Sequence, residues 1–289
     1  MGVRHMLFAF YFLKEGTRVF DRTELLTYFQ ANPNITMSKR GDDRIYHYHH
    51  PVLGFDADFI LTSKSVVPHL ERLNPKFYDV NFKVEFDILL PSYSVDMLLD
   101  ISEEISKMFK FAVYNESYED VIPFRKNILA KTFEHWKNAY KNKHEDDVAK
   151  YSRIDSTSLS EIYNYILRKP KLEVLLDKDK IQISDYFFLR TEKSRTAFIC
   201  MQWDGSSPFI LPPGVDIFYY QDNKHNKYIA LAELVGRAEK LFKSIDGYGT
   251  LKMIDGKNVG KLKKIITKTK FAPLTVELRE IKLTNILDV

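Results

Sequence analysis

Cysteine is nearly absent from the chain, since Cys200 is the only one in 289 residues. A single cysteine excludes an intramolecular disulfide, so packing must stabilise the fold, and a reducing compartment fits this composition. Long apolar runs are also missing. The run 6–13 is too short to span a membrane, and the Lys-Glu-Gly sequence after it is not a small-residue cleavage site. We therefore expect a cytoplasmic protein without membrane contact, and whether residues 1–5 are native stays open.

A strong charge imbalance and a phosphate-binding loop are missing as well. The formal net charge of +4 is small for this length and by itself indicates little about partners. A Walker loop needs four residues between its glycines and then Lys followed by Ser or Thr. Here six residues separate Gly249 from Gly256, three separate Gly256 from Gly260, and Asn258 follows Lys257. The sequence therefore lacks this phosphate-binding loop, and we expect no cofactor.

Aromatic and aliphatic residues are plentiful. Hydrophobic residues make up 45% of the chain and charged residues 28%, with 17 tyrosines and 21 phenylalanines. This composition is globular, and its aromatic side chains can bury a large area. The length suits one large domain or two ordinary ones.

The N-terminal part mixes strand-like alternation with helix-like periodicity. In the segment 81–90 the residues Phe82, Val84, Phe86 and Ile88 fall on one face. A sheet with helices on one face is the arrangement that this order favours. The predicted elements are strands over 6–13, 44–50, 55–62, 81–90 and 110–114, a short helix over 22–31, and an amphipathic helix that begins at Ser94.

The middle of the chain is charged and helical, and the C-terminal part is again mixed. The polar stretch 141–158 is the best candidate for a linker, and a helix after it should end before Pro170. The later predicted elements are strands over 181–190, 196–203, 215–220, 251–254 and 274–283, a helix over 228–245 that Asp246 and Gly247 end, and a lysine-rich helix over 258–269.

We thus predict an α+β protein of two mixed sheet-plus-helix halves. Its parts are an N-terminal α+β domain over 1–120, a charged helical connector over 121–170 and a C-terminal α+β domain over 171–289. The segments 87–99 and 208–220 resemble each other, because an apolar run meets Leu-Pro and then Val-Asp in both. This similarity raises the hypothesis of an internal repeat, with chance as the alternative.

The segment 44–61 carries three of the eight histidines. Alternation along a strand places His47 and His49 on one face, and Asp56 and Asp58 share a face of the next strand. Two imidazoles and two carboxylates could ligate zinc only if three or four of them converged. The intervening positions are hydrophobic, so the four side chains should instead lie on the solvent face of a hairpin. We expect no metal here, and a metal-dependent enzyme centred on these residues is the second alternative function.

Cys200 is flanked by apolar residues, so we interpret it as a buried hydrophobic side chain rather than a nucleophile. The C-terminal lysines carry a clearer charge signal. From Lys224 onward there are fourteen basic and seven acidic residues. A helix over 258–269 would align Lys257, Lys261, Lys264 and Lys268 on one outer face, a pattern that can follow phosphates. The alternative is an ordinary solvated lysine face.

Trp203, Tyr219 and Tyr220 lie next to predicted turns. Tyrosine and tryptophan often anchor protein interfaces, although they are equally common at the rims of α+β cores. We predict an interface role for these three rings. The resulting hypothesis is a non-enzymatic binding or interaction protein with a protein partner or self-association. Nucleic acid or another polyanion at the lysine face is the first alternative.

Overall fold

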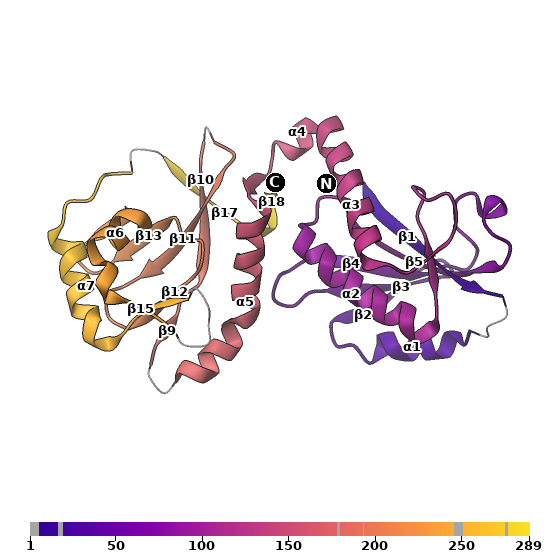
Figure 1. The fold of residues 1–289 in the computed structure, drawn as a ribbon, viewed down its shortest axis with the longest axis horizontal. Coiled ribbons are helices and arrows are strands. Elements are labelled where there is room, and N and C mark those ends of the chain that lie inside the picture. Colours follow the sequence, from indigo (N-terminus) through magenta and orange to yellow (C-terminus); the bar gives the residue numbers. More distant parts are fainter. Residues whose placement is uncertain (1–5, 17–19, 178–179, 193, 246–250, 275–276) are drawn as a thin grey trace. The chain divides into compact units, whose positions relative to one another are not determined.

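The computed structural model describes residues 6–16, 20–177, 180–192, 194–245, 251–274 and 277–289. The chain divides into two compact units, Met1–Val148 and Ala149–Val289 (Figure 1). The division falls inside the polar stretch 141–158. Helices and sheets occur in both units, which confirms the α+β class. Among the described residues, none of the helices combines the length and the apolar character that a membrane span requires.

The first unit is built on a seven-stranded sheet with the strand order β2-β3-β4-β5-β1-β6-β7. Every neighbouring pair in this sheet is antiparallel. The elements are β1 (Leu7–Glu15), α1 (Arg22–Gln30), β2 (Ile35–Arg40), β3 (Asp43–His49), β4 (Asp56–Leu61), the 3-10 turn η1 (Leu70–Arg72), β5 (Phe77–Asp87), α2 (Ser92–Phe109), β6 (Ala112–Tyr114), β7 (Ile122–Pro123), α3 (Lys126–Lys143) and α4 (Glu145–Val148).

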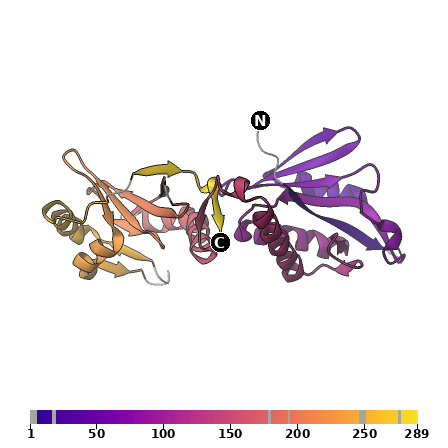
Figure 2. The same ribbon diagram turned by 90° about the horizontal axis from the view of Figure 1, so that it is seen from above.

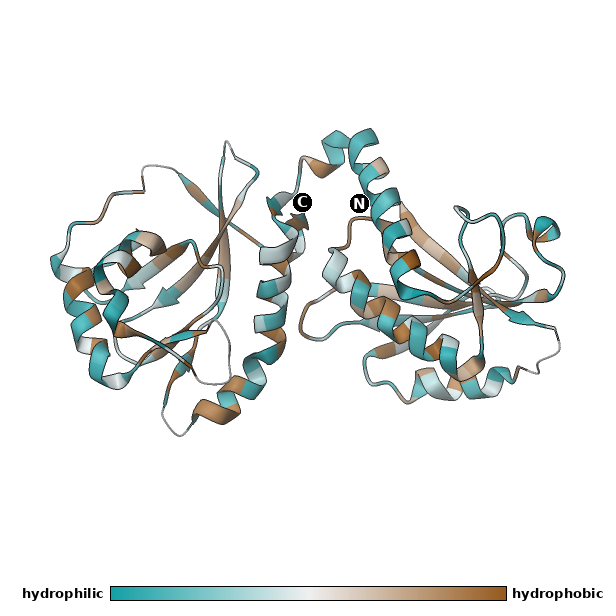
Figure 3. Ribbon diagram, viewed as in Figure 1, coloured by the Kyte–Doolittle hydropathy of each residue, from teal (hydrophilic) through white to brown (hydrophobic). Residues whose placement is uncertain are grey.

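Helices α1, α2 and α3 lie on one face of this sheet (Figure 2). Strand β5 alternates buried and partly exposed residues along most of its length, as its sequence predicts. The face against the helices is aromatic. Phe12 and Phe82 stack with ring centroids 4.8 Å apart, and Phe133 of α3 meets Phe8 edge-on at 5.4 Å. Large rings on both layers explain why these amphipathic helices pack here. Figure 3 shows the alternation of hydrophobic and hydrophilic residues along them.

The second unit contains a five-stranded sheet in the order β14-β13-β11-β10-β17 and a four-stranded sheet in the order β15-β16-β12-β9. Strands β8 and β18 form a separate parallel pair. The elements are β8 (Ser152–Ile154), α5 (Ser156–Leu176), β9 (Gln182–Ile183), β10 (Tyr186–Thr191), β11 (Ala197–Trp203), β12 (Phe209–Leu211), β13 (Ile217–Gln221), β14 (Asn226–Ala230), α6 (Leu231–Ala238), η3 (Glu239–Leu241), β15 (Phe242–Ser244), β16 (Lys252–Ile254), α7 (Gly256–Lys268), β17 (Leu278–Ile281), η4 (Leu283–Asn285) and β18 (Ile286–Asp288).

The prediction that the helix after the polar stretch ends before Pro170 is wrong, because α5 runs through this proline to Leu176. A proline inside a helix removes one hydrogen bond and costs about 3 kcal/mol. Tyr165 and Leu172, on either side of it, are both buried in a cluster with Ile210. Their burial offsets the cost and lets the helix continue.

The helix predicted over 228–245 is also wrong at both ends. Residues up to Ala230 belong to β14, which pairs with β13, and only Leu231–Ala238 is α-helical. Residues Phe242–Ser244 form β15. The predicted helix end at 246–247 lies outside the described residues. The lysine-rich helix is confirmed as α7, which Asp255 caps by accepting a hydrogen bond from the Asn258 amide.

The hypothesis of an internal repeat is wrong, because the two similar segments, 87–99 and 208–220, adopt different structures. Val95 and Asp96 of the first segment are in helix α2, whereas Val215 and Asp216 of the second precede strand β13. The sheets of the two units also differ in strand order. The similarity of the two segments is therefore local.

Candidate functional site

The histidine segment forms the predicted hairpin. In the pairing of β3 with β4, His47 lies opposite Asp58 and His49 lies opposite Asp56. Each histidine Nδ1 is within hydrogen-bond distance of its partner's Oδ1, at 2.6 Å and 2.7 Å respectively. The four side chains thus form two separate cross-strand pairs on the solvent side. Within the part of the chain that the structure describes, no group of three or more His, Cys, Asp or Glu side chains could hold a metal ion.

Ser38 of the edge strand β2 adds a contact that sequence reasoning missed. Its Oγ lies 2.7 Å from Nε2 of His47. A carboxylate only accepts hydrogen bonds, so His47 donates from Nδ1 to Asp58, and its Nε2 lies within hydrogen-bond distance of the Ser38 hydroxyl. This serine–histidine–aspartate order is that of a nucleophile relay. However, the His47 and Asp58 side chains are 45% and 38% exposed, so this pair lies in contact with solvent.

Cys200 is fully buried in strand β11. Burial, and secondarily the nearby Asp216, raises the pKa of its thiol to about 12. The thiol is therefore protonated at neutral pH. Because the thiolate is the reactive form, the side chain is unreactive under these conditions. The structure therefore agrees with its interpretation as a packed hydrophobic residue.

The expectation that Trp203 and Tyr220 are surface rings is wrong, because both are 0% exposed. They lie on the inner face of the five-stranded sheet, where Trp203 packs against Phe209 and Phe218 with centroids 5.1 Å and 6.0 Å away. Their polar atoms are satisfied internally. The Trp203 indole donates to the Ser207 carbonyl at 2.8 Å, and the Tyr220 hydroxyl donates to Asp222. These contacts fill the core and leave neither ring for a partner.

Tyr219 is different because side chains alternate along β13. Its half-buried ring lies on the opposite, outer face of the sheet, stacked on Tyr228 of β14 with a centroid distance of 4.5 Å. Phe187 of β10 meets Tyr219 edge-on at 6.1 Å. Tyr228 is 39% exposed. Of the three predicted interface residues, Tyr219 alone keeps a surface position, and the interface role itself stays a prediction.

Helix α7 places its lysines as predicted. Lys257, Lys261, Lys264 and Lys268 are all exposed, while Leu262 and Ile266 are buried beneath them. We call these four residues the lysine ridge. Within the described part of the chain, no ridge lysine forms an ion pair with a carboxylate. The nearby acids have other partners, since Asp255 pairs with Lys243 and Asp222 lies 3.6 Å from Lys263.

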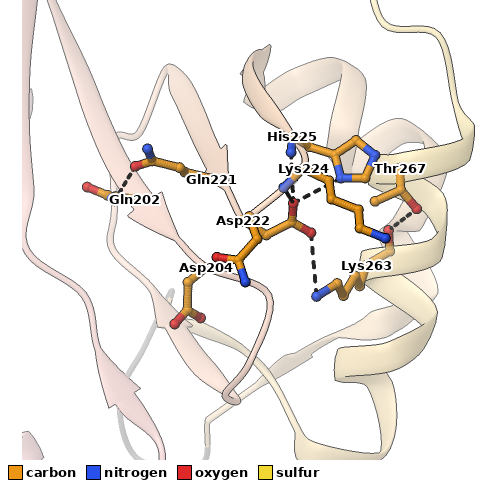
Figure 4. A pocket seen from close by; sticks show the side chains of 9 residues that line it. Gln202, Asp204, Gln221, Asp222, Lys224, His225, Lys263 and Thr267 are labelled. Carbon is orange, nitrogen blue, oxygen red and sulfur yellow. Dashed lines mark hydrogen bonds and ion pairs between the residues drawn. The ribbon is translucent and has the colours of Figure 1, made fainter.

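A polar pocket of about 760 Å³ lies on the flank of α7 (Figure 4). Its walls are the turn between β13 and β14, the end of β11 and two residues of α7. Asp222 organises the turn because its Oδ1 accepts from the backbone amides of Lys224 and His225, both at 2.8 Å, and lies 2.9 Å from Nδ1 of His225. The lining residues are Gln202, Asp204, Gln221, Asp222, Asn223, Lys224, His225, Lys263 and Thr267.

Asp222 has little capacity left for chemistry. The Tyr220 hydroxyl, followed by the turn amides, holds the pKa of this carboxyl well below its ordinary value. The carboxylate is therefore ionised at neutral pH, and both of its oxygens accept hydrogen bonds. Such a carboxylate fixes the β13–β14 turn against α7, so we assign it a structural role rather than that of a general base.

Comparison of the chain with protein-family models, with curated proteins and with solved structures finds no match in any of the three.

Proposed function

We propose that this protein binds polyanions, with double-stranded nucleic acid as the ligand class, through the lysine ridge of α7. The observation that supports this proposal most directly is that all four ridge lysines are exposed and lack carboxylate partners among the described residues. From Gly256 to Lys270 the chain contains six lysines and no acidic residue. A phosphate that approaches this face therefore meets no carboxylate between Gly256 and Lys270, and the carboxylate of the N-cap residue Asp255 forms an ion pair with Lys243.

The spacing of the ridge suits a linear polyanion. Its positions follow the helical steps i, i+4, i+7 and i+11, so its ends are separated by about 16 Å along the axis at 1.5 Å per residue. Duplex DNA carries one charge per about 1.7 Å of axis, so a segment of this length offers several phosphates.

The ridge has no rings for stacking on bases. Phe271 follows the helix, and Arg237 lies over its ring at 5.6 Å. Single-strand binding relies on base stacking, whereas backbone contacts alone suit a duplex without sequence preference. We therefore infer a sequence-independent mode of binding to the phosphate backbone.

The test replaces Lys261, Lys264 and Lys268 together with glutamine and measures binding of a labelled duplex at several salt concentrations. If each ridge lysine contacts one phosphate, the logarithm of the association constant should fall with log[salt] with a slope of about −3.6 for the four lysines. In the triple variant the slope should become shallower by about 2.7. The matched control neutralises Lys64, Lys131 and Lys171, which are exposed outside α7. Equal affinity and equal slope in the two triple variants would reject the ridge as the binding site.

A further inference from the structure

The outer face of the five-stranded sheet carries a second pocket, which we call the sheet groove. It has a volume of about 670 Å³, in the range typical of ligand sites. Strands β10, β11, β13, β14 and β17 all contribute to it. Its lining includes Phe187, Gln202, Asp204, Tyr219, Tyr228 and Glu280.

The floor of the sheet groove is aromatic. Tyr219 stacks on Tyr228 at 4.5 Å, and Phe187 meets Tyr219 edge-on. Among the described residues, the cation–π contacts of lysine and arginine involve other rings. None of these cations lies over Phe187, Tyr219 or Tyr228. One face of Tyr228 is covered by Tyr219, but the Tyr228 side chain is 39% exposed, so a cation from outside can still contact this ring.

The charges around this floor are negative. The described lining contains the carboxylates of Asp185, Asp204 and Glu280 and no lysine or arginine. Asp185 is neutralised by an ion pair with Lys169. Asp204 accepts two hydrogen bonds from Ser206, at 2.8 Å from its amide and 2.6 Å from its hydroxyl, which keep the carboxyl ionised.

Glu280 is exposed on strand β17 and makes no ion pair within the described residues. The groove therefore has the opposite charge to the ridge. A phosphate would be repelled by Asp204 and Glu280, whereas a guanidinium or ammonium group would be attracted by the carboxylates and by the ring faces.

The size of the surface indicates a chain segment rather than a small amine. The groove shares Gln202 and Asp204 with the pocket beside α7. It shares Leu189, Tyr228 and Leu278 with a third pocket of about 520 Å³. The two neighbouring pockets carry lysines in their own linings, namely Lys224 and Lys263 in the first and Lys227 and Lys270 in the second. The proposed site is therefore the sheet groove alone, and a small cation would occupy only one part of its volume.

We propose that the sheet groove binds an arginine- or lysine-bearing segment of a partner protein. A basic side chain lies over the Tyr219–Tyr228 stack, and its charge pairs with Glu280 and Asp204. This site is independent of the proposed polyanion site, because its chemistry selects the opposite charge.

The test measures fluorescence anisotropy of a labelled Arg-Ala repeat peptide of eight residues on the full-length protein, with a Glu-Ala peptide of equal length as the probe control. We expect the Arg-Ala peptide to bind and the Glu-Ala peptide not to bind. Glu280→Gln and Tyr228→Ala should each weaken binding at least fivefold. The matched variants Glu239→Gln and Tyr78→Ala, at exposed positions away from the groove, should leave it unchanged.

Hydrogen exchange on the wild-type protein tests the site without any substitution. The Arg-Ala peptide should slow exchange in the segments that contain β14 and β17. Equal binding of the two peptides, or an unchanged affinity in both groove variants, would overturn the proposal. So would binding of single-stranded oligothymidine that Tyr228→Ala weakens. The Lys261, Lys264 and Lys268 variant should retain peptide binding, so failure of the ridge and failure of the groove are distinguishable.

Discussion

Replacement of Gly205 by alanine is expected to destabilise the second unit strongly. Gly205 has φ of +77°, and an added Cβ would lie 2.9 Å from Cε2 of Tyr220 and 3.1 Å from its hydroxyl oxygen. The left-handed conformation costs an alanine about 1–2 kcal/mol. The Tyr220 ring cannot move freely, because it is fully buried beside Trp203 and its hydroxyl is bound to Asp222.

The displaced ring adds an overpacking cost of about 1–3 kcal/mol. The free energy of unfolding should therefore fall by about 2–5 kcal/mol in total. Gly214→Ala is the matched control in the same unit. Gly214 has φ of +70°, but the nearest atom to its added Cβ is Ile199 Cδ1 at an ordinary 3.5 Å. This control should lose only the backbone part, about 1–2 kcal/mol.

The two tryptophans provide the assay, because Trp136 lies in the first unit and Trp203 in the second. In a Trp136→Phe background, urea unfolding followed by fluorescence reports Trp203 alone. The difference between the unfolding free energies of Gly205→Ala and Gly214→Ala isolates the cost of the contact with Tyr220. If the two variants unfold at the same urea concentration, the tight packing of Gly205 against Tyr220 is wrong.

Three further predictions concern buried or hydrogen-bonded groups. Cys200 should not react with a thiol reagent at pH 8 in the native protein and should react fully in denaturant, because burial raises the pKa of its thiol to about 12. Burial also raises the pKa of the Asp79 carboxyl, so between its unfolded and folded pKa values the native state binds more protons, and stability falls as pH rises through this window. Asp79→Asn should accordingly gain more thermal stability relative to wild type at pH 7 than at pH 4, and an equal gain would contradict the burial effect. Ser38→Ala should lower the free energy of unfolding by no more than about 1 kcal/mol, and a fluorophosphonate probe should label the wild type no more than this variant, since the His47 and Asp58 side chains beside Ser38 are 45% and 38% exposed to solvent.

Hydrophobic periodicity in the sequence correctly predicted the elements whose structure follows from the residues within the element itself. Strand β5 alternates because one of its faces is buried, and α7 combines an aspartate cap with buried residues four apart. The His47–Asp58 hairpin followed from the same alternation. In each case the hydrophobic residues that recur along the sequence are the residues that the fold buries.

Tertiary pairing decided the elements that local patterns missed. The predicted helix over 228–245 includes residues 228–230, yet these belong to β14, which pairs with β13 at the edge of the five-stranded sheet. Trp203 and Tyr220 have polar neighbours in sequence, but the parallel pairing of β11 with β13 turns both rings toward the core. The β11–β13 pairing passes over β12 in the sequence, so a local window does not contain this information.

The same alternation separates the two proposed binding surfaces. Tyr220 points into the core and its hydroxyl binds Asp222, which fixes the turn beside α7, whereas Tyr219, one residue earlier, points to the sheet groove. A cationic ridge and an acidic groove thus occur in one unit of a chain whose net charge is only +4. Because a net charge sums over both surfaces, it conceals each of them. If both proposals hold, the Lys261, Lys264 and Lys268 variant should lose duplex binding and keep peptide binding, whereas Glu280→Gln should weaken peptide binding without weakening duplex binding, since the two ligands require opposite fields.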